Sequence, residues 1–301
     1  MIEQIQILPV SLLSQEQECV NKLKRLAHSL HLEFGWHYLL DLTWILSQME
    51  FSKGLRVIDA GAGVGVMQWY LAERGMEVIS VDRESRSNLP AHFRLRYQVH
   101  GLRPEDLLPM QSILRSPRVN DRVSFKRTVA RGAEASLAWV SGHVARAFNS
   151  NKGSVSIYNQ DLCTLPDIPD CSIDAVVAVS ALEHNDPENM AQVVAELMRV
   201  LKPGKPLLAT LCAAKERDWF HEPSGGWCYT EATLKKIFDL SCETPSNYSL
   251  YNELFAQLRD CRELRENLAK FYFRSGDNGM PWGRWDPQYQ PVGVCKIKPD
   301  A

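Results

Sequence analysis

LRVIDAGAGVGVMQWYLAERGMEVISVDR, residues 55–83, places one helical segment between two short apolar runs. The first run, at 55–63, ends in glycines, and the second lies at 77–83. Continuous apolar runs of this length are typical of strands that are buried on both faces in a parallel sheet. Residues 66–75 between them predict a helix that Gly75 ends. The stretch is therefore predicted to be a β-α-β unit.

The same alternation of apolar runs and amphipathic segments continues along the rest of the chain. Asp186 and Pro187 supply an N-cap and a first-turn proline for a strongly periodic helix, and Ser14 and Gln17 have the spacing of a capping box. Alternating strands and helices predict a doubly wound α/β sheet. The pattern predicts strands at 154–162, within 172–184, at 207–213 and at 292–298, and helices at 14–32, 34–49, 187–201, 230–240 and about 250–272.

Composition describes an ordinary globular chain of 301 residues, 45% hydrophobic and 23% charged, with a net charge of −2. This charge provides no global field that would attract nucleic acid or an anionic membrane. Apolar runs such as 175–182 are shorter than the roughly 20 residues of a membrane-spanning helix. The N-terminus lacks the features of a secretory signal, and the eight cysteines form no C-x-x-C pair. We therefore expect free thiols, no metal site and a cytoplasmic protein.

The connection at 84–153 is much longer than an ordinary strand-to-strand connection. Residues 83–152 contain 13 lysines and arginines but only 5 aspartates and glutamates. One interpretation is a basic lid that covers a ligand and meets an anionic substrate. The alternative is a solvated helical lid whose arginines pair with acidic residues of the main domain. We predict a helical cap at 1–53 and a main domain at 54–301 that carries this insertion.

Gly61, Gly63 and Gly65 follow the first predicted strand of the β-α-β unit. Glycines permit a tight turn and a close approach of the backbone, and the next helix offers free N–H groups to an anion. The dinucleotide fingerprint would require glycine at position 66, where the chain has Val66. A nicotinamide cofactor is therefore disfavoured. The sequence also contains no nucleoside-triphosphate P-loop motif.

Four motifs together resemble those of the class I S-adenosylmethionine-dependent methyltransferases. They are the acidic residue and glycines of DAGAGVG at 59–65, Asp82 at the end of the next strand, NQDL at 159–162 and SALEH at 180–184. The resemblance covers about residues 55–212. It implies a seven-stranded, mostly parallel Rossmann-like sheet with S-adenosyl-L-methionine as cofactor.

The resemblance also implies which residues bind the cofactor. The three glycines would line its amino-acid part, with Asp59 near its ammonium group. Asp82 would hold the ribose hydroxyls, and Asp161 with Leu162 would contact the adenine, although Asp161 alone is equally typical of a turn cap. The predicted cofactor-binding set comprises Asp59, Gly61, Gly63, Gly65, Asp82, Arg83, Asp161, Leu162 and Ser180.

Methyl transfer to a neutral hydroxyl needs an aligned acceptor and a base. His184 follows the fourth predicted strand of the motif set, where ligands bind in open α/β sheets, and we predict it to be catalytic together with His37. His221 is a third candidate base. The alternative for each histidine is a purely structural role. Glu183, His184 and His221 could also form a divalent cation site.

The acceptor is expected to be a polar small molecule or glycan, including an anionic one. Nucleic acid bases are disfavoured because the chain has SALE where amino-methylating enzymes carry a Pro-Pro-aromatic motif and cytosine-C5 enzymes carry Pro-Cys. The segments at 35–48 and 273–287 resemble bacterial polysaccharide and secondary-metabolite methyltransferases. Trp282, Trp285 and Tyr289 would suit stacking on sugar rings or a packed lid. The alternatives are an N-methyltransferase of a small amine, an RNA ribose methyltransferase, and a non-catalytic cofactor-binding module; the sequence leaves the oligomeric state open.

Overall fold

The computed structural model describes residues 2–110, 152–270, 280 and 284–300. Most of the predicted basic insertion, residues 111–151, lies outside the described residues, as does Trp282.

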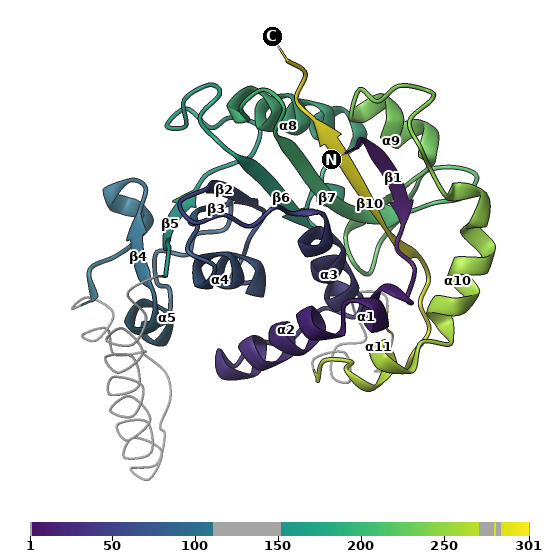
Figure 1. Cartoon of the computed structure of the whole chain (residues 1–301), viewed down its shortest axis with the longest axis horizontal. Helices are drawn as coiled ribbons and strands as arrows, with labels where there is room; N and C mark the ends of the chain where they lie inside the picture. Colours follow the sequence, from purple (N-terminus) through teal and green to yellow (C-terminus); the bar gives the residue numbers. More distant parts are fainter. Residues whose placement is uncertain (1, 111–151, 271–279, 281–283, 301) are drawn as a thin grey trace.

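One mixed sheet forms the centre of the described structure (Figure 1). Its strands are β1 (Gln4–Ile7), β2 (Arg56–Ala60), β3 (Glu77–Asp82), β4 (Gln98–Gly101), β5 (Ser154–Asn159), β6 (Ala175–Val179), β7 (Pro206–Ala213), β8 (Trp219–His221), β9 (Gly226–Tyr229) and β10 (Gln290–Ile297). The main order is β1-β10-β7-β6-β2-β3-β5-β4, and β9 joins β7 while β8 pairs with β9. The strands from β7 to β4 are parallel to one another, whereas β10 is antiparallel to both of its neighbours, β7 and β1. The predicted doubly wound, mostly parallel α/β class is confirmed.

Helices cover both faces of this sheet. They are α1 (Leu12–Gln15), α2 (Gln17–Ser29), α3 (Tyr38–Gln48), α4 (Val66–Glu73), α5 (Ala91–Arg96), α8 (Pro187–Val200), α9 (Glu231–Ile237), α10 (Tyr251–Arg259) and α11 (Arg262–Glu266), with short 3-10 turns η1 (Pro104–Asp106), η2 (Leu182–His184) and η3 (Tyr248–Leu250). The predicted cap of α8 is confirmed, because Asp186 accepts a hydrogen bond from the backbone of Asn189. Thr230 caps α9 in the same way by accepting a hydrogen bond from the backbone of Thr233.

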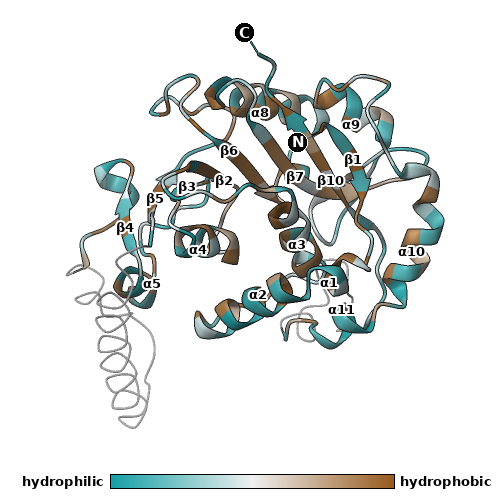
Figure 2. Ribbon diagram, viewed as in Figure 1, coloured by the Kyte–Doolittle hydropathy of each residue, from teal (hydrophilic) through white to brown (hydrophobic). Residues whose placement is uncertain are grey.

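Two apolar clusters lie on opposite faces of the sheet. One packs α2, α3 and α4 against the sheet, and the other packs α8 and α9 against its opposite face (Figure 1). Figure 2 shows the hydrophobic strands β6 and β7 enclosed between the helices. Val57 and Ile58 are neighbours on β2, and both are fully buried, one in each cluster. Burial on both faces explains why this strand has a continuous apolar run.

The strand order changes direction beside β2. The chain continues from β2 to β3 and β5 on one side, and β6 and β7 lie on the other side. The carboxyl ends of β2 and β6 therefore flank a topological switch point, where open α/β sheets bind their ligands.

Several predicted elements differ from those in the structure. The described residues contain ten strands, six of which correspond to strands that the sequence pattern predicts. The other four, β1, β4, β8 and β9, are only three or four residues long and carry too little alternation to be recognised. The resemblance implied a sheet of seven strands. Strand β1 lies within the predicted helical cap, and β4 lies within the predicted insertion and extends the sheet beside β5.

Two predicted helices are divided in the structure. Helix α2 begins at Gln17 without a side-chain cap, and Ser14 instead donates its hydroxyl proton to the carbonyl of Ser11, so the predicted capping box is wrong. The predicted helix at 250–272 breaks between α10 and α11. Leu258 and Leu264 are both buried but stand six residues apart, a spacing that a continuous helix would place on different faces.

Within the described ranges, we find no helix that combines the length and the apolar character needed to span a bilayer.

Candidate functional site

The glycine loop joins β2 to α4 and forms one wall of the site. Gly61 has a φ of +70°, and a Cβ atom there would lie 2.4 Å from the Cβ of Ala181. Its amide donates a hydrogen bond to the carbonyl of Val81 at 2.9 Å. Both the backbone conformation and the space therefore require glycine at this position.

Asp82 fixes the loop from the end of β3. Its Oδ2 accepts a hydrogen bond from the amide of Gly63 at 2.8 Å, and its Oδ1 accepts one from the amide of Glu84 at 2.8 Å. The carboxylate thus holds the loop through hydrogen bonds from backbone amides. Each oxygen keeps a second lone pair that can accept a hydrogen bond from a further donor.

A buried polar network supports the loop from beneath. Gln68 donates from Nε2 to the carbonyls of Gly63 and Gly65, both at 3.2 Å, and its Oε1 accepts a hydrogen bond from Ser80 at 2.8 Å. Arg86 donates to the carbonyl of Gly63 at 3.0 Å and to that of Ser80 at 2.6 Å. Sequence reasoning missed this network; its signal is a glutamine on the otherwise apolar helix α4. The network holds the loop in shape without any ligand.

Asp59 has one carboxylate oxygen without a partner. The side chain is 2% exposed, and its Oδ2 has no hydrogen bond to any described residue. Burial raises the pKa of this carboxyl to about 7, although the neighbouring Arg86 opposes the shift. An ammonium group from a ligand would satisfy this oxygen and restore its charge.

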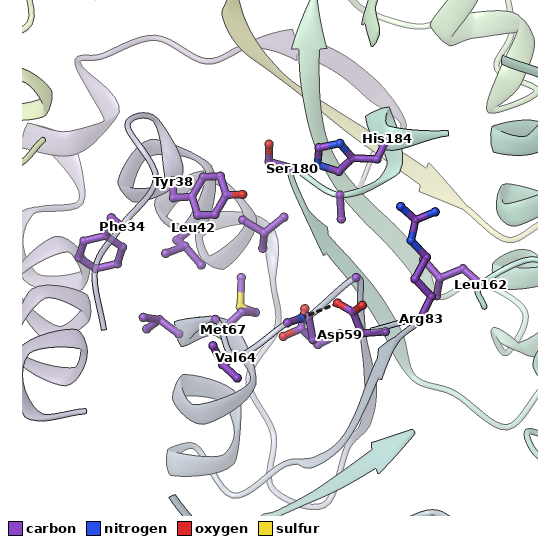
Figure 3. Close-up of a pocket in the computed structure, with 18 of the residues that line it drawn as sticks. Phe34, Tyr38, Leu42, Asp59, Val64, Met67, Arg83, Leu162, Ser180 and His184 are labelled. Carbon is purple, nitrogen blue, oxygen red and sulfur yellow. Dashed lines mark hydrogen bonds between the residues drawn. The ribbon is translucent and has the colours of Figure 1, made fainter. Parts of the chain in front are cut away.

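The loop faces a cavity of about 390 Å³ (Figure 3). All nine residues of the predicted cofactor-binding set line it, together with His184. Its other wall comes from Phe34, Tyr38 and Leu42, which precede β2 in the chain and lie opposite Asp59 and Leu162 in the close-up. Their contribution was not predicted, because nothing in the local sequence shows that 33–42 folds back over the sheet.

Asp161 serves the turn that follows β5 and also lines the cavity. Its Oδ1 accepts a hydrogen bond from the amide of Cys163 at 2.8 Å. The turn-cap interpretation and a position in the predicted adenine region are therefore compatible.

A second cavity of about 250 Å³ adjoins the first. Glu33, Tyr38, Ser180 and His184 line both cavities. The remaining lining residues of the second cavity are Gly35, Trp36, His37, Glu183, Cys212, Ser224 and Tyr289. The site is therefore a large cavity beside the glycine loop that continues into a smaller, aromatic one.

The two predicted catalytic histidines occupy different places in this arrangement. His184 lies where the cavities meet, and its Nδ1 is 3.0 Å from the carbonyl of Gly225. His37 lines the second cavity only, is 2% exposed, and places its Nδ1 2.5 Å from Oδ2 of the buried Asp41. In the neutral tautomer that donates from Nδ1, Nε2 of either ring is the basic nitrogen.

His221 lines neither cavity and lies behind Ser224 and Tyr289 of the second one. Its Nδ1 is 2.7 Å from the hydroxyl of Ser224, and burial lowers its pKa. Among the residues that the structure describes, no group of three or more His, Cys, Asp or Glu side chains is arranged to hold a metal ion. Glu183, His184 and His221 are not grouped in this way among the described residues, and Nδ1 of His221 contacts Ser224 instead.

Comparison with known protein families gives one match. Residues 132–209 match a family described as a methyltransferase domain, a range that includes β5, β6, α8 and the first half of β7. A comparison with curated proteins found no significant match.

Solved structures of similar fold include the [4+2]-cyclase SpnF, with 16% identity, coverage of 99% of each chain and a TM-score of 0.49. A putative sarcosine dimethylglycine methyltransferase from Galdieria sulphuraria has 14% identity, coverage of 86% of this chain and 84% of that chain, and a TM-score of 0.43. The 1,6-didemethyltoxoflavin-N1-methyltransferase of Burkholderia thailandensis has 13% identity, coverage of 95% and 88%, and a TM-score of 0.43. Similarities of this size carry no argument about the acceptor of this chain.

Proposed function

We propose that the chain is a class I S-adenosylmethionine-dependent methyltransferase that transfers a methyl group to an oxygen of a polar small-molecule or glycan-type acceptor, since residues 132–209 match a methyltransferase domain. The observation that supports this proposal is the pair of joined cavities. The larger has the glycine loop and the carboxylates expected for the cofactor, and the smaller has a buried histidine. Residues 1–53, the proposed cap, supply walls to both.

The larger cavity fits the cofactor through its hydrogen-bonding groups. Asp59 would accept a hydrogen bond from the ammonium group of the cofactor through Oδ2, which has no partner among the described residues. Asp82 and Arg83 would meet the ribose, and Asp161 with Leu162 would meet the adenine. The glycine loop and Ser180 would line the methionine part. When bound, the cofactor supplies an electrophilic methyl group on a sulfonium.

The smaller cavity would hold the acceptor. The acceptor oxygen would receive the methyl group that the bound cofactor supplies, and the hydroxyl proton would pass to Nε2 of a histidine. His37 is the stronger candidate, because the carboxylate of Asp41 orients its ring and stabilises the imidazolium that forms. Nδ1 of His184 faces the backbone carbonyl of Gly225, where His37 has the carboxylate of Asp41. Both remain proposed catalytic residues.

The experiment that tests this function measures turnover with radiolabelled methyl donor on a panel of neutral and phosphorylated sugars, phenols and small amines. With an active acceptor in hand, His37→Gln should lower kcat by about 10²-fold or more, the usual contribution of a general base. Affinity for S-adenosylhomocysteine should not change, since His37 does not line the larger cavity.

Two outcomes would contradict parts of this proposal. If His37→Gln keeps full turnover and His184→Gln loses it, the base is His184. If both variants keep full turnover on an amine, the protein is an N-methyltransferase, since a neutral amine needs no base.

We also propose a cytoplasmic location. All eight cysteines are free thiols, three of them buried, as is usual in a reducing compartment.

A further inference from the structure

The second cavity has a composition that bears on its ligand. At about 250 Å³ it lies below the roughly 300–1,000 Å³ of pockets for drug-sized ligands. It therefore suits one ring or a short chain better than a nucleotide. The rings of Trp36, Tyr38 and Tyr289 line it, and aromatic faces pack well against such a group.

The carboxylates at this cavity are matched by no lysine or arginine among the described residues that line it. Glu33 and Glu183 line it, and Asp41 lies behind His37 in the same wall. A negative group that entered would be repelled by the charged form of these carboxyl groups, and this repulsion is strong where water is excluded. The basic side chains of the described lining are the two histidines, His37 and His184.

Glu183 is the most deeply buried of these carboxyl groups. It is 1% exposed, and Oε1 accepts hydrogen bonds from the hydroxyl of Ser180 and, at 3.7 Å, from the thiol of Cys212. Its Oε2 has no partner among the described residues. Burial raises the pKa of this carboxyl, while His184 and His37 favour its charged form. Glu183 thus lies within electrostatic reach of both candidate bases.

We propose that Glu183 is a specificity-determining residue that makes the second cavity accept an uncharged, hydroxyl-bearing ring and reject groups carrying phosphate or carboxylate. This inference rests on the proposed function, in which that cavity holds the acceptor. It departs from the sequence-based expectation of an anionic acceptor, which came from the basic residues at 83–152.

The first test uses matched pairs of acceptors that differ only in charge. Methyl glucoside is compared with its 6-phosphate, and catechol with 3,4-dihydroxybenzoate, each as a methyl acceptor and as a competitor of any active acceptor. The uncharged member should be preferred by about tenfold or more, as expected for one nearby carboxylate at intermediate dielectric. Glu183→Gln should reduce this preference, whereas the control Glu188→Gln, at an exposed position outside both cavities, should leave it unchanged. Preference for the anionic member would overturn the inference.

The second test does not depend on turnover. Ser224 lines the cavity, and Ser224→Cys places a reporter thiol there. Peptide mass spectrometry then compares its modification by two reagents of similar size, the uncharged 2-hydroxyethyl and the anionic 2-sulfonatoethyl methanethiosulfonate, with the exposed Cys242 as internal reference.

The anionic reagent should be slower at position 224 by about tenfold relative to the reference, and Glu183→Gln should narrow the gap. Equal relative rates at the two thiols, or a gap that Glu183→Gln does not change, would overturn the inference and leave the proposed function standing. Charge selectivity without methylation of any acceptor would count against the proposed function instead.

Discussion

Asp59 combines its proposed role in cofactor binding with a cost to the stability of the folded protein. Its pKa is about 7 in the folded protein, against an ordinary value of 3.8, because the side chain is buried. Between these two values the folded state binds more protons than the unfolded state, so stability falls as the pH rises. The cofactor-free protein therefore holds a destabilised carboxylate at neutral pH, and we expect the ligand ammonium to relieve it.

Asp59→Asn should separate these two effects. Without cofactor, the variant should gain stability over the wild type as the pH rises from 5 to 8, with an upper limit of about 4 kcal/mol. Its affinity for S-adenosylhomocysteine should fall by about tenfold or more, because a charge-assisted hydrogen bond is lost. Urea unfolding at several pH values and calorimetric titration measure the two quantities. Asp260→Asn, at an exposed position, is the control; a pH-independent difference for Asp59→Asn would show that Asp59 is not the titrating group.

A substitution of Gly61 tests the close approach of the glycine loop to Ala181, the residue that precedes η2. Gly61→Ala adds the cost of a positive φ, about 1–2 kcal/mol, and a Cβ that overlaps Ala181. Gly54→Ala is a matched control, since Gly54 has a φ of +78° and no atom within 4 Å of the added Cβ. Both variants should unfold at lower urea concentration, but only Gly61→Ala should lose cofactor affinity. Equal affinities in the two variants would contradict the assignment of the loop to the cofactor site.

The sequence was sufficient to predict those site residues that lie at the end of a predicted strand. Asp59, Asp82 and Asp161 lie at or just beyond the carboxyl ends of β2, β3 and β5, so the edge they share was predictable from the alternation of elements. Tyr289 and Cys212 reach the second cavity from strands that are distant in sequence, and no local pattern predicts such a meeting. The hydrogen bond from Arg86 to the carbonyl of Gly63 was equally unpredictable, because contacts between a side chain and a backbone carbonyl leave no pattern in the sequence.

At the scale of elements, α3 and β10 are fitted to each other. A Cβ atom at Gly293 of β10 would lie 2.5 Å from the ring of Trp44 of α3. That ring is 1% exposed, and its Nε1 donates to Gln6 of the neighbouring strand β1 at 2.8 Å. Helix α3 thus packs directly on the strand backbone, and this packing places His37 and Tyr38 at the start of α3 over the site.

Gly293→Ala should destabilise the protein by about 1–3 kcal/mol, the usual cost of overpacking. Urea unfolding measures the change, and Trp44→Leu in the same chain should recover part of the loss by removing the overlap. Additive effects of the two substitutions would contradict direct packing of α3 on β10.

Long elements were predictable and short or bent ones were not. Helix α8 has an N-cap, a first-turn proline and three turns of apolar periodicity, and these local signals agree with its packing. Strands of three or four residues such as β4 and β8 form because neighbouring strands offer them hydrogen bonds. Their existence depends on tertiary structure, which the local sequence does not contain.

At the scale of the whole molecule, the sheet brings both cavities to the switch point beside β2. The proposed cofactor residues come from β2, β3 and the loops after β2, β3 and β5. The proposed acceptor cavity is lined by residues of the 33–38 segment, by η2, by Cys212 of β7 and by Tyr289 just before β10. The ends of β6 and η2 belong to both, through Ser180 and His184. This shared wall is what would align a methyl donor with an acceptor.

The most direct test of this account is a calorimetric titration of the whole chain with S-adenosylmethionine and with S-adenosylhomocysteine. We expect saturable heat at one site per chain for both compounds, and Asp82→Ala should weaken binding by about 1–3 kcal/mol, the scale for an unmet buried polar group. Absence of heat for both compounds, or full affinity in Asp82→Ala, would contradict the assignment of the larger cavity to the cofactor.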